Sequence, residues 1–124
     1  MDLSKLKNKK ILIVEDDLTN SELINEIFDS LEVEIKSVYS GNEAIEICRK
    51  ENFDVVLMDI QLPGRNGYEA TREIKKMKPD MVIIAQTAYA FEADRQKSLE
   101  SGCSDYISKP FKKEELLKMV IRYL

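Results

Sequence analysis

Acidic, hydroxyl and ammonium side chains follow the short apolar segments of this sequence. They are Glu15, Asp16, Asp17, Asp59, Thr87 and Lys109. Carboxylates that are crowded together repel one another and raise each other's pKa unless a cation joins them. Magnesium takes oxygen ligands at ~2.0–2.1 Å and usually keeps several waters. If the fold brings these side chains together, the pattern therefore predicts a magnesium site.

The acidic residues suit different positions around such an ion. Asp16 and Asp59 are predicted to bind the metal directly, helped by the backbone carbonyl of Gln61. Glu15 is predicted to act through a bound water molecule. Asp54 serves as an internal comparison, because it lies five residues before Asp59, ~16 Å away along an extended strand.

Asp59 is the predicted nucleophile of this site. A carboxylate can attack a phosphoryl group and carry it as an acyl phosphate. The metal and Lys109 would neutralise the phosphoryl oxygens, and the Thr87 hydroxyl would donate a hydrogen bond to one of them. The residue types therefore indicate phosphoryl chemistry on an aspartate.

Five apolar segments alternate with patterns of helical spacing. The expected strands are Ile11–Val14, Val33–Val38, Val55–Met58, Met81–Ala85 and Tyr106–Ser108. The first helical stripe consists of Leu23, Ile24, Ile27, Phe28 and Leu31. Asp17 is expected to cap this helix, and Gly102 to end the fourth helix. Such alternation predicts right-handed βαβ units, hence an α/β fold with a parallel sheet and helices on both faces.

The apolar pattern also predicts the order of the strands. The first, third and fourth segments are continuous apolar runs, as strands covered on both faces require. Residues 31–36 alternate between apolar and charged, and the fifth segment is short and mixed, so both suit edges. The order 2-1-3-4-5 satisfies these constraints. Ligands of open parallel sheets bind beyond the carboxyl ends of the strands, where the polar residues of strands 1, 3, 4 and 5 would meet.

Composition excludes several other classes of protein. The 124 residues suit one domain over 1–124, with 1–9 as a solvated lead-in. A net charge of −4 argues against direct nucleic-acid binding. No apolar run approaches the ~20 residues of a membrane span, so we expect a cytoplasmic domain without membrane contact. With no histidine and no CxxC pair, zinc and haem sites and histidine-activated nucleophiles are not expected.

Four segments carry a family resemblance over nearly the whole chain. They are ILIVEDD, DVVLMDIQLPGRNGYEA, IIAQTAYA and DYISKPF, each at a strand end and in this order. Together they resemble the receiver domain of two-component response regulators. The resemblance implies a flavodoxin-like doubly wound (βα)5 fold. It also implies that Asp59 accepts a phosphoryl group from a phosphohistidine of a histidine kinase or histidine phosphotransfer domain, with Mg²⁺ or Mn²⁺ as cofactor.

The resemblance assigns further roles. Glu15 and Asp16 become the acidic pair, Thr87 and Tyr106 a switch pair, and Lys109–Pro110 a cis peptide. Since the chemistry is directed at its own aspartate, we do not class the domain as a conventional enzyme. The thin apolar stripe of the fourth helix favours an output surface on helix 4, strand 5 and helix 5. We also hypothesise that the ring of Tyr89 shields Asp59 from water.

Two alternatives and several open points accompany this interpretation. A haloacid-dehalogenase-like phosphohydrolase also uses an aspartate nucleophile, but it usually has a second acid where this chain has Gln61. A docking module without phosphorylation usually lacks the acceptor, the acidic pair or the lysine, which this chain retains. The stretches GYEATREIK and TAYAFEADRQKSLESGCSDYISKPF resemble receivers fused to hybrid sensor histidine kinases. A phosphorylation-dependent dimer is left open.

Overall fold

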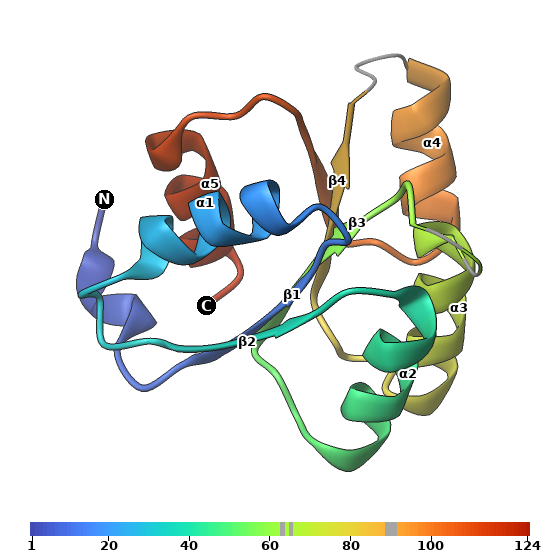
Figure 1. Cartoon of the computed structure of the whole chain (residues 1–124), viewed down its shortest axis with the longest axis horizontal. Coiled ribbons are helices and arrows are strands. Elements are labelled where there is room, and N and C mark those ends of the chain that lie inside the picture. The colour runs from blue at the N-terminus through green and yellow to red at the C-terminus, as the bar shows by residue number, and fades with distance from the viewer. Residues whose placement is uncertain (63, 65, 89–91) are drawn as a thin grey trace.

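The alternating segments form a five-stranded parallel sheet in the computed structural model, which describes residues 1–62, 64, 66–88 and 92–124 (Figure 1). The strands are β1 (Lys10–Val14), β2 (Glu34–Val38), β3 (Val55–Asp59), β4 (Ile83–Thr87) and β5 (Asp105–Ser108). The helices are α1 (Leu18–Phe28), α2 (Gly41–Lys50), α3 (Gly67–Met77), α4 (Glu92–Glu100) and α5 (Lys113–Arg122), with a short 3-10 helix, η1 (Leu3–Leu6), before β1. None of the helices within these described ranges is long and apolar enough to cross a membrane.

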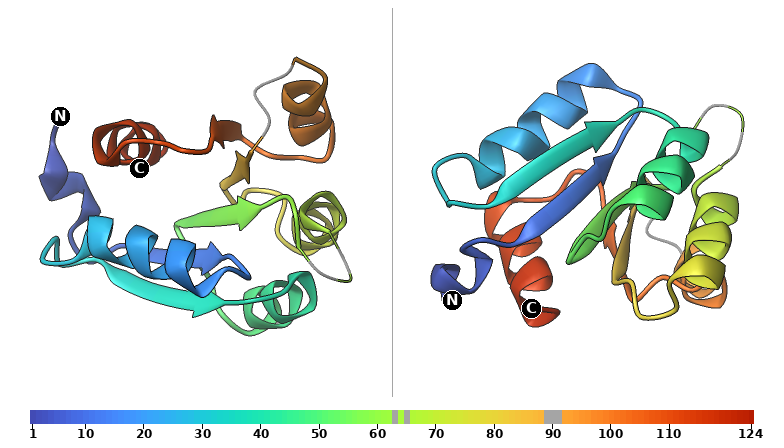
Figure 2. Two further views of the ribbon diagram at one scale, coloured as in Figure 1. Left: turned by 45° about the horizontal axis from the view of Figure 1, so that its top comes forward. Right: turned by 90° about the horizontal axis from the view of Figure 1, so that it is seen from below.

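The sheet order is β2-β1-β3-β4-β5, which confirms the predicted topology. Helices α1 and α5 cover one face, while α2, α3 and α4 lie on the other (Figures 1 and 2). Each face has its own buried apolar cluster, because the central strands send alternate side chains to opposite faces. The strands β1, β3 and β4 are thus almost completely buried, as the continuous apolar runs predicted.

The ends of two helices follow the predicted signals. The Asp17 carboxylate accepts hydrogen bonds from the backbone N–H groups of Thr19 and Asn20, so it caps α1. Gly102, just after α4, has φ +108°, a conformation that glycine adopts without a steric penalty. Both residues therefore mark element boundaries as expected.

The fourth strand differs from its predicted span of Met81–Ala85. It runs from Ile83 to Thr87, because its pairing with β3 begins at Val56 opposite Ile83. Met81 is buried without belonging to the strand, since it packs into the apolar cluster beneath α2 and α3. The apolar pattern thus predicted correctly that Met81 is buried, but it did not predict the residue at which the pairing of β4 with β3 begins.

Two leucines also depart from the sequence expectations. Leu23 is 54% exposed, which differs from its predicted place in the apolar stripe of α1. It precedes the buried Ile24 by one residue, and one residue turns an α-helix through about 100°. Leu6, the last residue of η1, is fully buried in the apolar cluster on the α1/α5 face of the sheet. The expectation of a solvated lead-in is therefore wrong at this residue.

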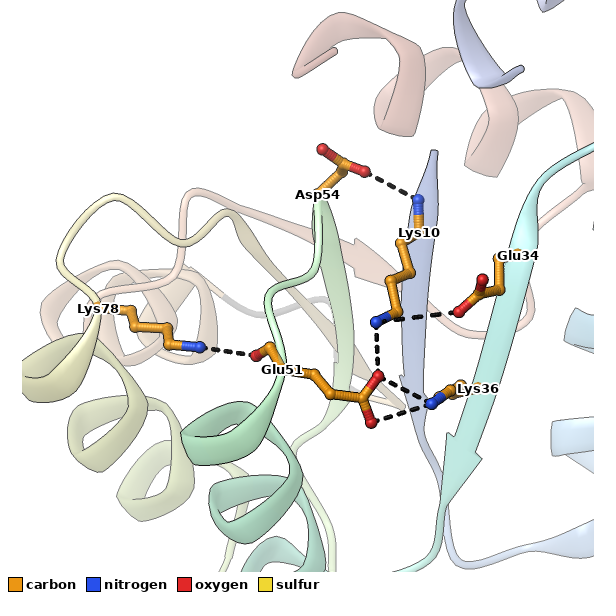
Figure 3. Close-up of polar contacts among 6 residues, drawn as sticks. All are labelled: Lys10, Glu34, Lys36, Glu51, Asp54 and Lys78. Carbon is orange, nitrogen blue, oxygen red and sulfur yellow. Dashed lines mark hydrogen bonds and ion pairs between the residues drawn. The ribbon is translucent and has the colours of Figure 1, made fainter. Parts of the chain in front are cut away.

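Charged side chains gather at the amino ends of the strands (Figure 3). The Glu51 carboxylate accepts hydrogen bonds from the ammonium groups of Lys10 and Lys36, and the Lys78 ammonium donates to the Glu51 backbone carbonyl. The Asp54 carboxylate accepts from the backbone N–H of Lys10 at 2.8 Å. This cluster ties β1 and β2 to the segments after α2 and α3, at the edge opposite the predicted magnesium site.

Candidate metal centre

The carboxyl ends of the central strands are held by main-chain hydrogen bonds that continue beyond the strands. The backbone N–H of Glu15 donates to the carbonyl of Val38 at 3.1 Å, and that of Ile60 donates to the carbonyl of Gln86 at 3.1 Å. These bonds extend the ladders of β1 and β3 into the loops. The first residues after both strands are therefore placed by the sheet itself.

Gly67, the first residue of α3, packs directly against the end of β3. A Cβ atom at this position would lie 2.3 Å from the backbone oxygen of Asp59 and 2.7 Å from the Cα of Ile60. The Gly67 N–H also donates to the Ile60 carbonyl at 3.0 Å. Absence of a side chain at Gly67 thus lets the helix approach Asp59 closely.

Three of the predicted carboxylates meet at this edge of the sheet. Glu15, Asp16 and Asp59 each offer one oxygen, and these oxygens all lie within 4.8 Å of one another. Glu15 is 1% and Asp59 4% exposed, whereas Asp16 lies at the surface. This set of oxygen donors, open to solvent on one side, fits Mg²⁺ and its retained waters. When bound, the ion would supply positive charge to the carboxylates and to a phosphoryl group.

Gln61 contributes a main-chain contact to the cluster. Its backbone N–H donates to Asp59 Oδ1 at 3.0 Å, which orients the carboxylate. The predicted role of its carbonyl as a metal ligand stays a prediction. Asp17, the third acid of the triplet, caps α1 instead, although its N–H donates to Glu15 Oε2 at 3.3 Å.

Lys109 brings a positive charge to the acidic cluster. Its Nζ donates to Glu15 Oε1 at 2.8 Å and lies 3.5 Å from Asp59 Oδ2. Its backbone N–H donates to the Thr87 carbonyl at 2.6 Å, which holds the end of β5 against the end of β4. The Lys109–Pro110 peptide bond is cis, the conformation that the resemblance implies. The strand-end pattern predicts that Lys109 lies in this cluster, but its direct pair with Glu15, a residue far away in the sequence, had no signal of its own.

The surroundings of Asp59 raise the pKa of its carboxyl group. Burial raises its pKa to about 7, with a hydrogen bond to Glu15 and the charge of Glu15 acting in the same direction. The Lys109 charge and the Gln61 N–H only partly offset this rise. Burial by itself would lower the pKa of Lys109, but its pairs with Glu15 and Asp59 raise that pKa overall. A divalent cation would therefore favour the ionised, nucleophilic form of Asp59.

The two predicted switch residues occupy neighbouring strands. Thr87 ends β4 and is 2% exposed. Tyr106 is half-buried on β5, opposite Ala85, and packs against the apolar cluster of the α2/α3 face. Tyr89, proposed from the sequence as a shield for Asp59, lies outside the described residues.

Gln86 is a buried polar residue next to this site that sequence reasoning missed. It lies between Ala85 and Thr87 on β4 and is fully buried. Neither its side-chain oxygen nor its nitrogen has a hydrogen-bond partner among the described residues. The available signal was a long polar side chain immediately after the apolar run Ile83–Ala85.

The chain matches the family model of the response regulator receiver domain over residues 11–121. It belongs to that family. Solved structures agree over almost the whole chain. The receiver domain of a sensor histidine kinase from Pseudomonas aeruginosa, with a magnesium ion coordinated in its active-site cleft, is 37% identical, with a TM-score of 0.87 and coverage of 94% of this chain and 97% of that one. A response regulator receiver domain protein from Methanospirillum hungatei is 30% identical (TM-score 0.87; coverage 94% and 93%).

A third relative shows a receiver domain with its partner. The receiver domain of a Saccharomyces cerevisiae response regulator, co-crystallised with the histidine phosphotransfer protein Ypd1, is 28% identical, with a TM-score of 0.89 and coverage of 95% and 90%. As a receiver domain, this chain is a phosphoacceptor signalling module rather than a classical enzyme. Neither the phosphohydrolase nor the non-phosphorylated docking module is favoured.

Proposed function

We propose that the receiver domain accepts its phosphoryl group on Asp59, from a phosphohistidine of a histidine kinase or histidine phosphotransfer domain, with Mg²⁺ as cofactor. The observation that carries this assignment is the convergence of Glu15, Asp16 and Asp59 around one point, with the Lys109 ammonium beside them. Asp54, which lies just before the other end of β3, accepts a hydrogen bond on its carboxylate from the Lys10 N–H. The two aspartates at opposite ends of this strand thus have different surroundings and different predicted roles.

The residues of the cluster have different roles in phosphoryl transfer. An oxygen of the Asp59 carboxylate forms the new O–P bond as the P–N bond to the imidazole breaks, and the electron pair of that bond returns to the imidazole, which takes up a proton. Lys109 is placed to neutralise the phosphoryl oxygens, because its ammonium lies 3.5 Å from Asp59. Asp16 and Asp59, with the Gln61 carbonyl, would hold the ion directly, and Glu15 would hold it through water.

We propose that phosphorylation changes the positions of the Thr87 and Tyr106 side chains and thereby alters the surface of α4, β5 and α5. The Thr87 carbonyl accepts a hydrogen bond from the Lys109 N–H, so the backbone of Thr87 is linked directly to that of Lys109. Helix α4 is held by little apolar burial: Leu99 is 41% exposed and Ser98 is the buried residue assigned to the helix. Weakly packed elements are those that two-state transitions displace most readily.

The partner and the setting follow the family relatives. The Saccharomyces complex supports a histidine phosphotransfer domain as phosphoryl donor, and the Pseudomonas domain supports a link to a hybrid histidine kinase. A single domain over 1–124, a cytoplasmic location, no direct nucleic-acid or membrane contact, and Mn²⁺ as an alternative ion stay predictions. The phosphorylation-dependent dimer also remains open.

Intact-mass measurement after incubation with acetyl phosphate and Mg²⁺ tests the assignment. We expect a single adduct of ~80 Da, the mass of one phosphoryl group. Asp59→Asn should abolish it, Asp54→Asn should retain it, and chelation of the metal should prevent it. An adduct that survives Asp59→Asn would place the acceptor elsewhere. Turnover of a generic phosphomonoester would instead support the phosphohydrolase.

A further inference from the structure

Gln86 lies next to Asp59 in the sheet. The two residues are register partners in the ladder of β3 and β4, and neighbouring strands lie ~4.8 Å apart. Two residues before them, Leu57 and Ile84 both belong to the apolar cluster of the α1/α5 face. Because side chains alternate along a strand, Asp59 and Gln86 point to that same face. The Gln86 side chain therefore flanks Asp59 on the side of β4.

The Lys109 side chain crosses β4 to reach the acidic cluster. Lys109 follows β5, the edge strand beyond β4, whereas Asp59 ends β3 on the other side of β4. The Lys109 ammonium nevertheless lies 3.5 Å from Asp59 Oδ2 and donates to Glu15 Oε1 at 2.8 Å. Lys109, Glu15 and Gln86 border the same cavity between α1 and α5. The lysine therefore crosses β4 on the face to which Gln86 points.

The side-chain amide of Gln86 lacks a hydrogen-bond partner in this arrangement. Its oxygen and its nitrogen are both buried, and neither is paired among the described residues. Buried amides are nearly always hydrogen-bonded, and an unpaired one lowers stability. Because other protein atoms cover both amide atoms, only a neighbouring side chain can become the partner. The Lys109 ammonium, which carries three N–H donors, is such a neighbour.

Magnesium and the Lys109 ammonium compete for the same carboxylates. The oxygens of Glu15, Asp16 and Asp59 that could hold the ion lie within 4.8 Å of one another. The ammonium is 2.8 Å from Glu15 and 3.5 Å from Asp59, and two cations this close repel each other. The proposed function also assigns Glu15 to a water molecule of the ion. Lys109 therefore leaves Glu15 when the ion binds, and its ammonium needs another acceptor next to Asp59.

We propose that Gln86 is a positioning residue: when Mg²⁺ binds, its amide oxygen accepts a hydrogen bond from the Lys109 ammonium and holds that ammonium beside Asp59. This exchange of acceptors moves Lys109 away from the ion and keeps its charge where the phosphoryl oxygens would lie. An amide oxygen that is unpaired in one arrangement becomes paired in the other, so Gln86 favours the arrangement with bound Mg²⁺. The inference rests on the magnesium site of the proposed function.

Amide NMR titration of the intact, unphosphorylated chain with Mg²⁺ tests the proposal. Gln86→Met keeps the length of the side chain and removes both polar atoms, so it should raise the Kd for Mg²⁺ about tenfold. Gln86→Leu has a different shape and should have the same effect, because the amide rather than the packing is responsible. Asn25→Leu is the matched control: the Asn25 amide donates to the Ser21 carbonyl and the Ser37 hydroxyl, so its loss should leave the Kd unchanged.

A double-mutant cycle separates positioning of Lys109 from a structural role of Gln86. If the amide acts through the ammonium, the effect of Gln86→Met on the Kd for Mg²⁺ should disappear in a Lys109→Met background. A side chain that merely supports the fold would have the same effect in both backgrounds. A tenfold loss that persists without Lys109 would therefore overturn the proposal.

Urea denaturation tests the exchange of partners without a Lys109 variant. In the absence of Mg²⁺, Gln86→Met should leave the unfolding midpoint unchanged or raise it, because it replaces an unpaired amide with an apolar side chain. At saturating Mg²⁺ its midpoint should fall below that of the wild type, because the hydrogen bond to Lys109 is then lost. Asn25→Leu should lower the midpoint under both conditions.

The outcomes distinguish this inference from the proposed function. Equal Mg²⁺ affinities of wild type and Gln86→Met would overturn the inference alone. A lowered midpoint of Gln86→Met without Mg²⁺ would do the same, because it would show that the amide is already paired within the fold. A wild type that binds no Mg²⁺ would contradict the proposed function and with it the inference. None of these readouts depends on phosphorylation.

Discussion

Replacing the predicted phosphoacceptor should make the metal-free domain more stable. Asp59 is 4% exposed, and burial together with the neighbouring Glu15 raises its pKa to about 7. At pH 8 the folded protein must therefore hold an ionised carboxylate in an unfavourable place. Asp59→Asn keeps the size and one acceptor oxygen for the Gln61 N–H while removing the charge.

The size of the effect follows from the pKa. A rise from 3.8 to about 7 corresponds to a cost of ~4 kcal/mol in the folded state, at about 1.4 kcal/mol per unit. The introduced amide brings a new N–H₂ group that needs hydrogen-bond partners in a buried site. This requirement offsets part of the stability gained by removing the charge. We expect Asp59→Asn to raise the free energy of unfolding by about 2–4 kcal/mol at pH 8 without divalent ions.

The pH dependence has a definite sign. Between pH 4 and 7 the folded wild type keeps a proton on Asp59 that the unfolded chain releases, because the folded pKa is the higher one. The wild type should therefore gain stability relative to Asp59→Asn as the pH falls through this range. Urea denaturation at pH 8, 6 and 4.5 measures how the difference in unfolding free energy between Asp59→Asn and the wild type decreases. Saturating Mg²⁺ at pH 8 should also decrease this difference, because the ion stabilises the wild type more than the variant.

The control for this experiment is Asp54→Asn at the other end of β3. The Asp54 carboxylate accepts a hydrogen bond from the Lys10 N–H, and its replacement should not stabilise the fold. A wild type that is more stable than Asp59→Asn at pH 8 without metal would refute the account. It would mean that the Lys109 ammonium outweighs both burial and the charge of Glu15.

Three further changes have expected outcomes of their own. Gly67→Ala should lower the free energy of unfolding by about 3 kcal/mol, because its Cβ would meet the backbone oxygen of Asp59 at 2.3 Å, and it should slow phosphorylation by acetyl phosphate; unchanged values for both would contradict the packing described. Leu6→Ala should cost about 3 kcal/mol in urea denaturation, since Leu6 is fully buried; a change near zero would restore the solvated lead-in. Two lysine ammonium groups lower the pKa of Glu51 to about 2, so its stabilising contribution should be complete above about pH 4.5 and lost as the pH falls towards 2. Glu51→Gln should flatten this part of an acid-denaturation profile, and an unaltered profile would show that the lysine pairs contribute nothing.

Local chemistry explains which features were predictable from the sequence. Side-chain periodicity and turn signals act over a few residues, so the continuous apolar runs of β1, β3 and β4 predicted central strands, and Asp17 predicted the start of α1. The edge position of β2 followed in the same way from its alternating charges. The polar residues at the strand ends then predicted which carboxylates meet.

The sequence by itself thus determined the order of the strands and the acidic cluster, because both depend on local patterns repeated along the chain. Only the tertiary structure decided that Lys109 pairs with Glu15, that β4 starts at Ile83, and that Leu6 is buried. The raised pKa of Asp59 and the unpaired amide of Gln86 belong to the same class. Each depends on distance and exclusion of water between segments remote in the chain, and no local pattern of residues encodes those quantities.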